Sequence, residues 1–299
     1  MVAPVMSNWD NDDKSKWLIF SDVNGLFVNG SGQVDGLGLS WWDCDSSDKK
    51  DTVTFHACNN LHLSGLNFVN SPKNHISINT CEGATISNIN ITAPDDSPNT
   101  DGIDISDSAH VQIHDSFIGT GDDCIAINDG CSFINITNVA CGPGHGISVG
   151  SLGANEEHNT VEHIHVKNCN FTRTQNGVRI KTWPGGSGYA RNITFEQITL
   201  DNVDNPIIID QYYCNGHDNC ENKTSNVQVS GVTYNRVHGT SSNPTPINLS
   251  CSTTVPCTNM LMSEIDIKQV NQEQKNQATC INAHGISMNT SPAVPCLGK

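Results

Sequence analysis

The chain has 299 residues, with 31 acidic and 15 basic side chains, which gives a formal net charge of -16 at pH 7. Only 15% of the residues are charged, and the mean hydropathy is -0.35, so uncharged polar residues fill much of the chain. A chain this acidic lacks the basic surface that nucleic acid requires. No apolar stretch reaches the roughly 18 residues of a membrane helix. Nucleic-acid binding and a bilayer-spanning helix are therefore excluded.

The N-terminal segment, residues 1–10, has neither the basic residues nor the apolar run of a secretion signal. The cysteines and sequons of the chain, by contrast, are typical of secreted proteins. We therefore expect that this chain lacks the natural N-terminus of its protein.

A short strand pattern, in which apolar and polar residues alternate, returns at nearly regular intervals along the chain. Period-2 alternation between turn residues predicts half-buried strands. The steps from Ile103 to Ile125 and from Ile125 to Ile147 are both 22 residues. The pattern occurs at 76–79, 103–106, 125–128, 147–150, 178–181, 207–210 and 247–250, with further alternating runs at 111–114, 134–137 and 193–196.

Short strands in a 22-residue cycle are explained most simply by a chain that winds as a coil. Each turn stacks its strands on the turn below, and the inward side chains form a continuous core. The sequence thus predicts an all-β, right-handed parallel β-helix of roughly ten coils at the ordinary strand spacing, as one domain over residues 1–299. A β-propeller is the alternative, but its blades usually repeat at about 40 to 45 residues.

The chain contains 13 cysteines, far more than a reducing compartment favours. Cys214 with Cys220 and Cys251 with Cys257 share one spacing, and neither pair has a second pair at zinc-ligand spacing. We predict two local disulfides, no metal site of this kind, and at least one cysteine left over. Eight N-x-S/T sequons also indicate a secreted glycoprotein, and they begin at Asn29, Asn90, Asn135, Asn170, Asn192, Asn222, Asn248 and Asn289.

Chemistry-bearing residues recur at one position of the repeat, two residues before the first apolar residue of a strand. Asp101, Asp123 and His145 occupy this position in three successive coils, and Asp122 lies beside it. Stacked coils bring such residues about one strand spacing apart. Like charges at that separation raise the pKa of at least one carboxyl group, so the sequence predicts a catalytic acid cluster.

Two other interpretations of these acids stay open. Aspartate is a common turn former. A calcium site is the second possibility, although the spacing does not match an EF-hand loop; its candidate ligands are Asp95, Asp96, Asp101, Asp104 and Asp107.

Two cations follow on a later strand. In residues 178–181 the alternation points Arg179 and Lys181 away from the core, so we expect both to face solvent. The positions that match Arg179 in the preceding coils are Ala126 and Ser148, both small. This pattern predicts a cleft with a small-residue floor and two cations that bind a carboxylate, unless they are simply a solvated surface pair.

Residues 146–150 match the G-x-S-x-G nucleophile elbow. That elbow requires a strand, a sharp turn and then a helix. Ser148 lies inside a predicted strand with no helical pattern after it, so we reject it as a nucleophile.

Four motifs identify a family at this point. N-T-D-G-I-D at 99–104, G-D-D-C-I-A-I at 121–127, G-H-G-I-S-V-G-S at 144–151 and R-I-K at 179–181 resemble the signature motifs of polygalacturonases. These are pectin-hydrolysing glycoside hydrolases of family 28, and the plant branch is the most similar. The resemblance runs from about residue 17 to residue 296 and implies a right-handed parallel β-helix. It also implies hydrolysis of α-1,4 galacturonosyl linkages with inversion, without a cofactor.

The resemblance assigns roles to the acid cluster. Asp122 is similar to the general acid that protonates the leaving oxygen, and Asp101 and Asp123 match the pair that positions and deprotonates water. His145 resembles the residue that tunes the acid. Since inverting enzymes usually hold acid and base about 6.5 to 9.5 Å apart, we expect Asp101 and Asp122 to approach that separation.

The resemblance also assigns the binding residues. Arg179 and Lys181 match the residues that bind the substrate carboxylate, and Tyr213 resembles a substrate-binding tyrosine. Cys124 with Cys141 resembles a family disulfide.

The resemblance implies secretion to the cell wall and pectic polysaccharide as the partner. Family members usually begin with a signal peptide and additional N-terminal coils, and we expect that this chain lacks both. We also expect a monomer. Endo and exo action remain open. The alternatives are a hydrolase of a related pectin such as rhamnogalacturonan, a calcium-dependent pectate lyase, or an inactive wall-binding β-helix.

Overall fold

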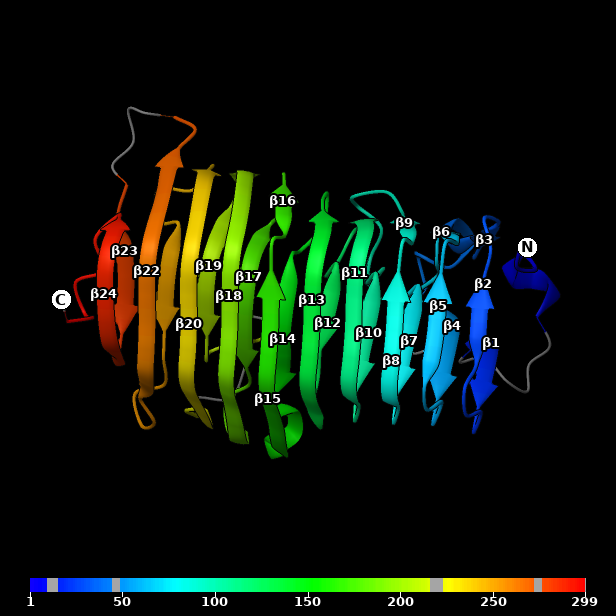
Figure 1. Ribbon diagram of the computed structural model, residues 1–299, viewed down its shortest axis with the longest axis horizontal. Coiled ribbons are helices and arrows are strands. Elements are labelled where there is room, and N and C mark those ends of the chain that lie inside the picture. The colour runs from blue at the N-terminus through cyan, green and yellow to red at the C-terminus, as the bar shows by residue number, and fades with distance from the viewer. Residues whose placement is uncertain (10–15, 45–48, 216–222, 272–275, 299) are drawn as a thin grey trace.

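The strands of this chain lie side by side along a rod that runs from the N-terminal to the C-terminal end (Figure 1). The computed structural model describes residues 1–9, 16–44, 49–215, 223–271 and 276–298. Strands of successive coils pair in parallel. The fold is a right-handed parallel β-helix, as the repeat predicts, and the alternative β-propeller is excluded.

The strands form two long sheets, and each coil contributes to both. The ten-stranded sheet contains β1 (Lys16–Ser21), β4 (Asp51–His56), β7 (Ile76–Asn79), β10 (Ile103–Ser106), β12 (Ile125–Ile127), β14 (Ile147–Leu152), β17 (Asn176–Thr182), β19 (Asn205–Asp210), β21 (Ile247–Ser250) and β23 (Ala278–Ile281). The path of the second sheet contains β2 (Phe27–Asn29), β5 (Leu61–Ser64), β8 (Glu82–Ser87), β11 (Ala109–Gly119), β13 (Cys131–Cys141), β15 (His158–Lys167), β18 (Ser187–Val203), β20 (Asn226–Ser241), β22 (Cys257–Gln269) and β24 (Ala283–Ser291). Beside that path pair β3 (Gln33–Asp35), β6 (Asn67–Val69), β9 (Asn90–Thr92) and β16 (Asn170–Thr172).

Helical structure in the described residues is limited to three short 3-10 turns, η1 (Met6–Asn8), η2 (Gly38–Ser40) and η3 (Ala154–Glu156). None of them has the length and apolar character needed to span a bilayer. The seven predicted repeat strands coincide with β7, β10, β12, β14, β17, β19 and β21.

The core consists of apolar columns that run along the rod. One column of the ten-stranded sheet is formed by the first apolar residue of each repeat strand. In it Ile103 pairs with Ile125, Ile125 with Ile147, and Ile207 with Ile247. All of these side chains are fully buried. Burial of such a side chain contributes about 1.5 to 3 kcal/mol, so the columns hold one coil on the next.

Asparagine and aspartate mark one corner of the coils, where the backbone must turn with a positive φ. Asp115, Asn138 and Asn168 have φ values of 52°, 55° and 52°. These residues tolerate the left-handed region better than most others. Their side chains also link the coils, since the Asn168 amide donates to Asn138 Oδ1 at 2.7 Å and the Asn138 amide donates to Asp115 Oδ1 at 2.9 Å.

Disulfides close several loops. Cys124 is bonded to Cys141 and Cys251 to Cys257, as predicted. Cys214 is also disulfide-bonded, and its predicted partner, Cys220, lies outside the described residues. A further disulfide, which the spacing did not predict, joins Cys280 to Cys296.

Five cysteines in the described part of the chain carry free thiols. Burial raises the pKa of the Cys131 and Cys169 thiols to about 12. Free thiols occur at Cys44, which is half-buried, and at Cys58, Cys81, Cys131 and Cys169, which are buried.

Candidate active site

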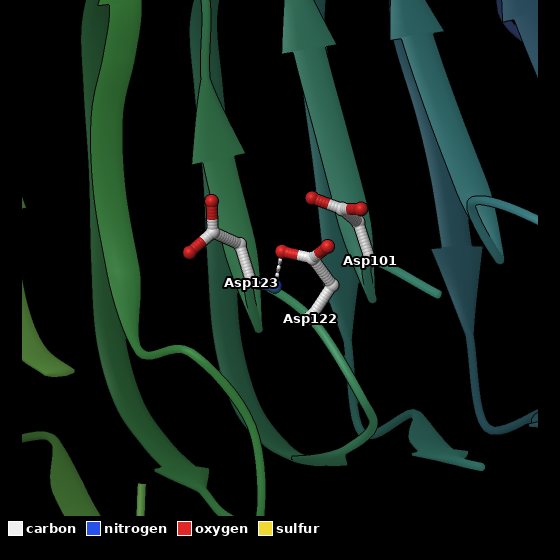
Figure 2. Close-up of side chains that lie close together, drawn as sticks. All are labelled: Asp101, Asp122 and Asp123. Atoms are coloured by element: carbon white, nitrogen blue, oxygen red, sulfur yellow. Dashed lines mark hydrogen bonds between the residues drawn. The ribbon is translucent and has the colours of Figure 1, made fainter. Parts of the chain in front are cut away.

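Three carboxylates meet where two neighbouring strands of the ten-stranded sheet begin. Asp101 lies just before β10, and Asp122 and Asp123 lie just before β12, which pairs with β10. One oxygen of each carboxylate lies within 4.8 Å of one oxygen of each of the others. In Figure 2 the Asp122 side chain lies between the other two. The coils therefore bring together the acids that the repeat aligns.

Close approach of neighbouring coils shapes the backbone next to these acids. A Cβ at Gly102 would lie 2.5 Å from the Cys124 carbonyl oxygen, and one at Gly146 would lie 2.3 Å from the Asn176 carbonyl oxygen. Gly146 also has a φ of 90°, which a residue with a Cβ rarely adopts. Glycine is therefore required directly after Asp101 and His145.

Asp123 is the buried member of the cluster, with 1% of its surface exposed. Its Oδ1 accepts hydrogen bonds from Ser148 Oγ at 2.7 Å and Arg179 Nη2 at 2.8 Å. Its Oδ2 accepts one from Lys181 Nζ at 2.9 Å. Burial raises the pKa of a carboxyl group, but the charges of Lys181 and Arg179 outweigh it and hold the pKa of Asp123 below its usual range. Asp123 therefore stays ionised.

The expectation that Arg179 and Lys181 face solvent is wrong. Their exposed fractions are 9% and 7%, and each forms an ion pair with Asp123. Both lie on the outer side of β17, yet their side chains turn toward the preceding coils because a buried carboxylate requires compensating charge. Burial lowers the pKa of Lys181, but the neighbouring Asp123 charge raises it above its usual value.

The pKa of Asp101 is shifted in the opposite direction from the pKa of Asp123. Burial is the main cause that raises its pKa well above the usual value, and the negative charges of Asp122, Asp104 and Asp123 add to it. Lys181 opposes this shift only in part. Two neighbouring carboxyl groups with pKa values pushed apart are typical of acid-base sites, and the cluster retains a proton that an isolated aspartate would have lost.

His145 contacts Asp122 through both its ring and its backbone. The ring Nδ1 lies 3.0 Å from Asp122 Oδ1, and the backbone N–H donates to the Asp122 carbonyl oxygen at 2.7 Å. The Asp123 backbone N–H donates to the same Oδ1 at 2.8 Å. Asp122 is therefore held in one orientation by contacts from two coils.

The wide separation expected between the Asp101 and Asp122 carboxyl groups stays a prediction, but their closest oxygens lie nearer to each other than that separation. Their nearest oxygens lie within 4.8 Å, whereas inverting glycosidases usually hold acid and base about 6.5 to 9.5 Å apart. The two residues lie on adjacent coils, and adjacent strands are only about 4.8 Å apart. The carboxylate spacing by itself therefore does not indicate inversion.

A cleft of about 630 Å³ opens beside the cluster. Asp122, His145 and Arg179 line it, so the acid and one cation face the same space. The other lining residues are Gln175, Asn176, Asn205, Asp210, Tyr212, Tyr213, Cys214 and Asn215.

Tyr213, predicted to bind substrate, is one of these cleft residues. Its ring lies 5.2 Å from Lys181 Nζ and packs edge-to-face against Trp183 at 5.3 Å between ring centres. Its hydroxyl donates to Asn215 Oδ1 at 2.8 Å. The neighbouring Tyr212 also lines the cleft, so the sequence could not tell which tyrosine is used.

Two residues of the cleft were not predicted from the sequence, although they occupy the same position of the repeat as the acids. Asn176 and Asn205 lie two residues before Val178 and Ile207, which is the repeat position of Asp101 in later coils. Continuing the same column toward the C-terminus would have identified both.

Ser148 lies within β14 and is not followed by an α-helix, so the nucleophile elbow is absent. Its hydroxyl donates to Asp123 Oδ1 and accepts from Arg179 Nε at 2.9 Å. Ser148 therefore connects the buried carboxylate to the guanidinium.

Among the described residues, Asp101, Asp122 and Asp123 are the acids close enough together to share one cation. Asp95, Asp96 and Asp107 do not join them, so the calcium grouping considered from the sequence does not form there. Two ion pairs already supply positive charge at Asp123.

Comparison with known proteins gives a consistent result. The sequence profile of glycosyl hydrolases family 28 matches residues 5–292. The chain is 49% identical over 301 residues to a probable polygalacturonase of Arabidopsis thaliana, covering 99% of this chain and 66% of that protein. It is 41% identical over 299 residues to a polygalacturonase of Chamaecyparis obtusa, covering 96% of this chain and 57% of that protein. The chain thus spans about two thirds or less of these relatives.

Solved structures show the same fold. An endo-xylogalacturonan hydrolase from Aspergillus tubingensis aligns with a TM-score of 0.80 and 28% identity, covering 98% of this chain and 80% of that one. A polygalacturonase from Erwinia carotovora aligns with a TM-score of 0.74 and 22% identity, covering 92% and 77% of the two chains.

Proposed function

The chain belongs to glycosyl hydrolases family 28, and we propose that it hydrolyses α-1,4 galacturonosyl linkages in pectin or polygalacturonate. The observation that carries this proposal is the cluster of Asp101, Asp122 and Asp123, of which Asp122 lines a cleft together with Arg179. The acids supply proton transfer at a glycosidic bond, and the cation suits a substrate that carries a carboxylate on each sugar.

We assign Asp122 as the general acid because it lines the cleft and is fixed by His145. Asp101 has the raised pKa. Because an oxygen of Asp101 lies within 4.8 Å of an oxygen of Asp122, the proton held by Asp101 can pass to Asp122. Asp122 then passes this proton to the leaving glycosidic oxygen as the bond to the anomeric carbon breaks.

We propose that water, and not a carboxylate of the protein, attacks the anomeric carbon. Asp123 is buried and ion-paired with Arg179 and Lys181, so it is poorly placed to bond to a sugar. Asp101 loses nucleophilicity while it keeps a proton. Asp123 helps to orient the water. Asp101, once its proton has passed by way of Asp122 to the leaving oxygen, takes one proton from the water as the new C–O bond forms. This proposal gives inversion despite the short carboxylate spacing, and NMR of the first anomer released tests it.

Substrate binding is assigned to Arg179, Lys181 and Tyr213. Arg179 lines the cleft and has five N–H donors, which suits a galacturonate carboxylate. Lys181 adds positive charge and orders the Tyr213 ring, which offers a face for a sugar. A protein of net charge -16 gains no overall attraction to a polyanion, so binding depends on these local cations.

The direct test is the release of reducing ends from polygalacturonate by the wild-type chain and by Asp122→Asn. Loss of a general acid costs about 10²- to 10⁴-fold in rate, so we expect a fall of that size in kcat. Asp266→Asn, an exposed substitution on β22, is the matched control and keeps full activity. Equal rates for wild type and Asp122→Asn would contradict the assignment.

The same assay separates the alternative functions. Products that absorb in the ultraviolet, and that no longer form when a chelator is added, would indicate a calcium-dependent lyase. Faster cleavage of a xylose-substituted galacturonan would favour the activity named for the Aspergillus tubingensis enzyme. Rhamnogalacturonan is the remaining pectic substrate to compare, and no cleavage of any of them would indicate a binding protein.

We also propose that the protein is a monomeric, secreted cell-wall glycoprotein. The disulfides support an oxidising compartment. The sequon asparagines Asn29, Asn135, Asn170, Asn192 and Asn289 are exposed, while Asn222 lies outside the described residues. Mass spectrometry of the protein from its natural source tests secretion and glycosylation together.

A further inference from the structure

A fully buried histidine lies one coil before the acid cluster. His75 directly precedes β7, which pairs with β10, the strand that follows Asp101. The ring of His75 is completely shielded from solvent. The corresponding positions in the next three coils are Gly102, Cys124 and Gly146, so none of them can provide a ring.

Both ring nitrogens of His75 have backbone partners. Nδ1 lies 3.0 Å from the Asp101 carbonyl oxygen, and Nε2 lies 3.2 Å from the Ser71 backbone nitrogen. A carbonyl oxygen only accepts and a backbone N–H only donates. Nδ1 must therefore carry the proton and Nε2 must be bare, which allows a single tautomer of the neutral ring.

The backbone of Asp101 is held twice by the same residue. The His75 backbone N–H also donates to the Asp101 carbonyl oxygen, at 2.8 Å. Since that carbonyl belongs to a residue of the acid cluster, its position affects where the Asp101 carboxyl group lies.

The other end of this connection is fixed as well. Ser71 accepts a hydrogen bond at its carbonyl oxygen from Trp42 Nε1 at 3.0 Å, and its hydroxyl accepts one from Thr52 Oγ1 at 2.7 Å. The Ser71 hydroxyl in turn donates to the Asn74 carbonyl oxygen at 2.8 Å. The residue that holds Nε2 is thus itself bonded to neighbouring segments.

We propose that His75 is a positioning residue for Asp101: its neutral Nδ1–H tautomer connects the anchored Ser71 backbone to the acid cluster. This inference rests on the proposed function, because it assigns a role in the hydrolysis carried out by that cluster. Burial lowers the pKa of His75 to about 4, so the ring remains neutral in the tautomer that these contacts require above that pH.

Two substitutions of His75 separate its two contacts. In His75→Asn the side-chain amide nitrogen takes the place of Nδ1 and keeps the donor to Asp101. In His75→Gln the side-chain oxygen reaches the place of Nε2 and keeps the acceptor for Ser71. Each variant loses one buried contact, so we expect similar falls in melting temperature.

Activity on polygalacturonate distinguishes the two variants. Misplacement of a catalytic group by about 1 Å can cost 10²-fold. We expect His75→Gln to lose about 10-fold or more in kcat with little change in KM, and His75→Asn to stay within about 3-fold of wild type. Equal kcat values for the variants, or a higher value for His75→Gln, would overturn the positioning role. An inactive wild-type chain would instead reject the proposed function.

A second measurement needs no substitution. Nitrogen-15 NMR of the native protein between pH 5 and 7 should show His75 as a neutral ring protonated at Nδ1. A charged ring, or a proton on Nε2, would contradict the inference whatever the variants do.

Discussion

The same coils carry two columns of side chains, one that faces the core and one that faces outward, and the two columns differ in how much their residues depend on their neighbours. The inward column contains Ile103, Ile125 and Ile147, which are all fully buried and differ little in environment. The outward column, two residues earlier in each coil, contains Asp101 and Asp123, whose pKa values shift in opposite directions. The stacking of coils fixes the position of a side chain, but neighbouring side chains decide its chemistry.

The pKa values of the two acids differ because the acids have different neighbours. Arg179 and Lys181 extend from two coils further along and reach Asp123. Asp101 is acted on chiefly by burial and by other acids. One repeat position therefore contains an acid that stays charged and another that keeps its proton.

The largest effect is expected for Asp123→Asn. The substitution leaves Arg179 and Lys181 buried without their counter-charge, and breaking such a pair typically costs about 3 to 5 kcal/mol of folding free energy. Urea denaturation followed by circular dichroism measures the loss, with Asp266→Asn as the control. An unchanged unfolding midpoint would show that the ion pairs do not support this part of the fold.

A somewhat smaller effect is expected in the inward column, for Ile247→Ala. Removal of a buried isoleucine side chain costs about 2 to 5 kcal/mol. Ile247 lies on β21, well along the sheet from the acids on β10 and β12, so kcat of the folded protein should not change. Thermal melting and initial rates test the two expectations, and a fall in kcat would show that the columns are not independent.

The smallest effect has the opposite sign. The folded pKa of Asp101 is raised, so its contribution to stability is fully present below an unfolded pKa of about 3.9 and is lost as pH rises through the folded pKa. Asp101→Asn removes the cost of ionising this carboxyl group beside other acids. The variant should be inactive yet more stable than wild type at pH 7, by on the order of 1 kcal/mol.

The control for this prediction is pH itself. Well below the unfolded pKa of about 3.9 both the folded and unfolded carboxyl groups are protonated, so the difference in melting temperature between Asp101→Asn and wild type should vanish. A variant that melts below wild type at pH 7 would contradict the assigned direction. Asp123 should behave oppositely, since its lowered pKa stabilises the fold above the unfolded pKa and that gain is lost at acid pH.

The repeat was sufficient to predict the strands and the alignment of the acids. Alternating apolar residues determine which face is buried, and a regular 22-residue step places Asp101 next to Asp123. Asn176 and Asn205 continue the same column in later coils, so the repeat could also have placed them in the cleft.

The direction of the two cations could not be predicted in this way. Alternation only says that Arg179 and Lys181 leave the core, and their long side chains then turn toward a carboxylate whose burial the sequence does not reveal. The disulfide between Cys280 and Cys296 was missed for a related reason, because pairing depends on which loops the last coils bring together.

The buried free thiols can be used to follow how the coils of the rod separate, because a thiol reagent reaches them only after they become exposed. Cys58, Cys81, Cys131 and Cys169 are buried in different coils along the chain, while Cys44 is half-buried. A thiol reagent should label Cys44 first and reach the others only where coils separate. The order of labelling under mild denaturant would therefore show from which end the stack comes apart.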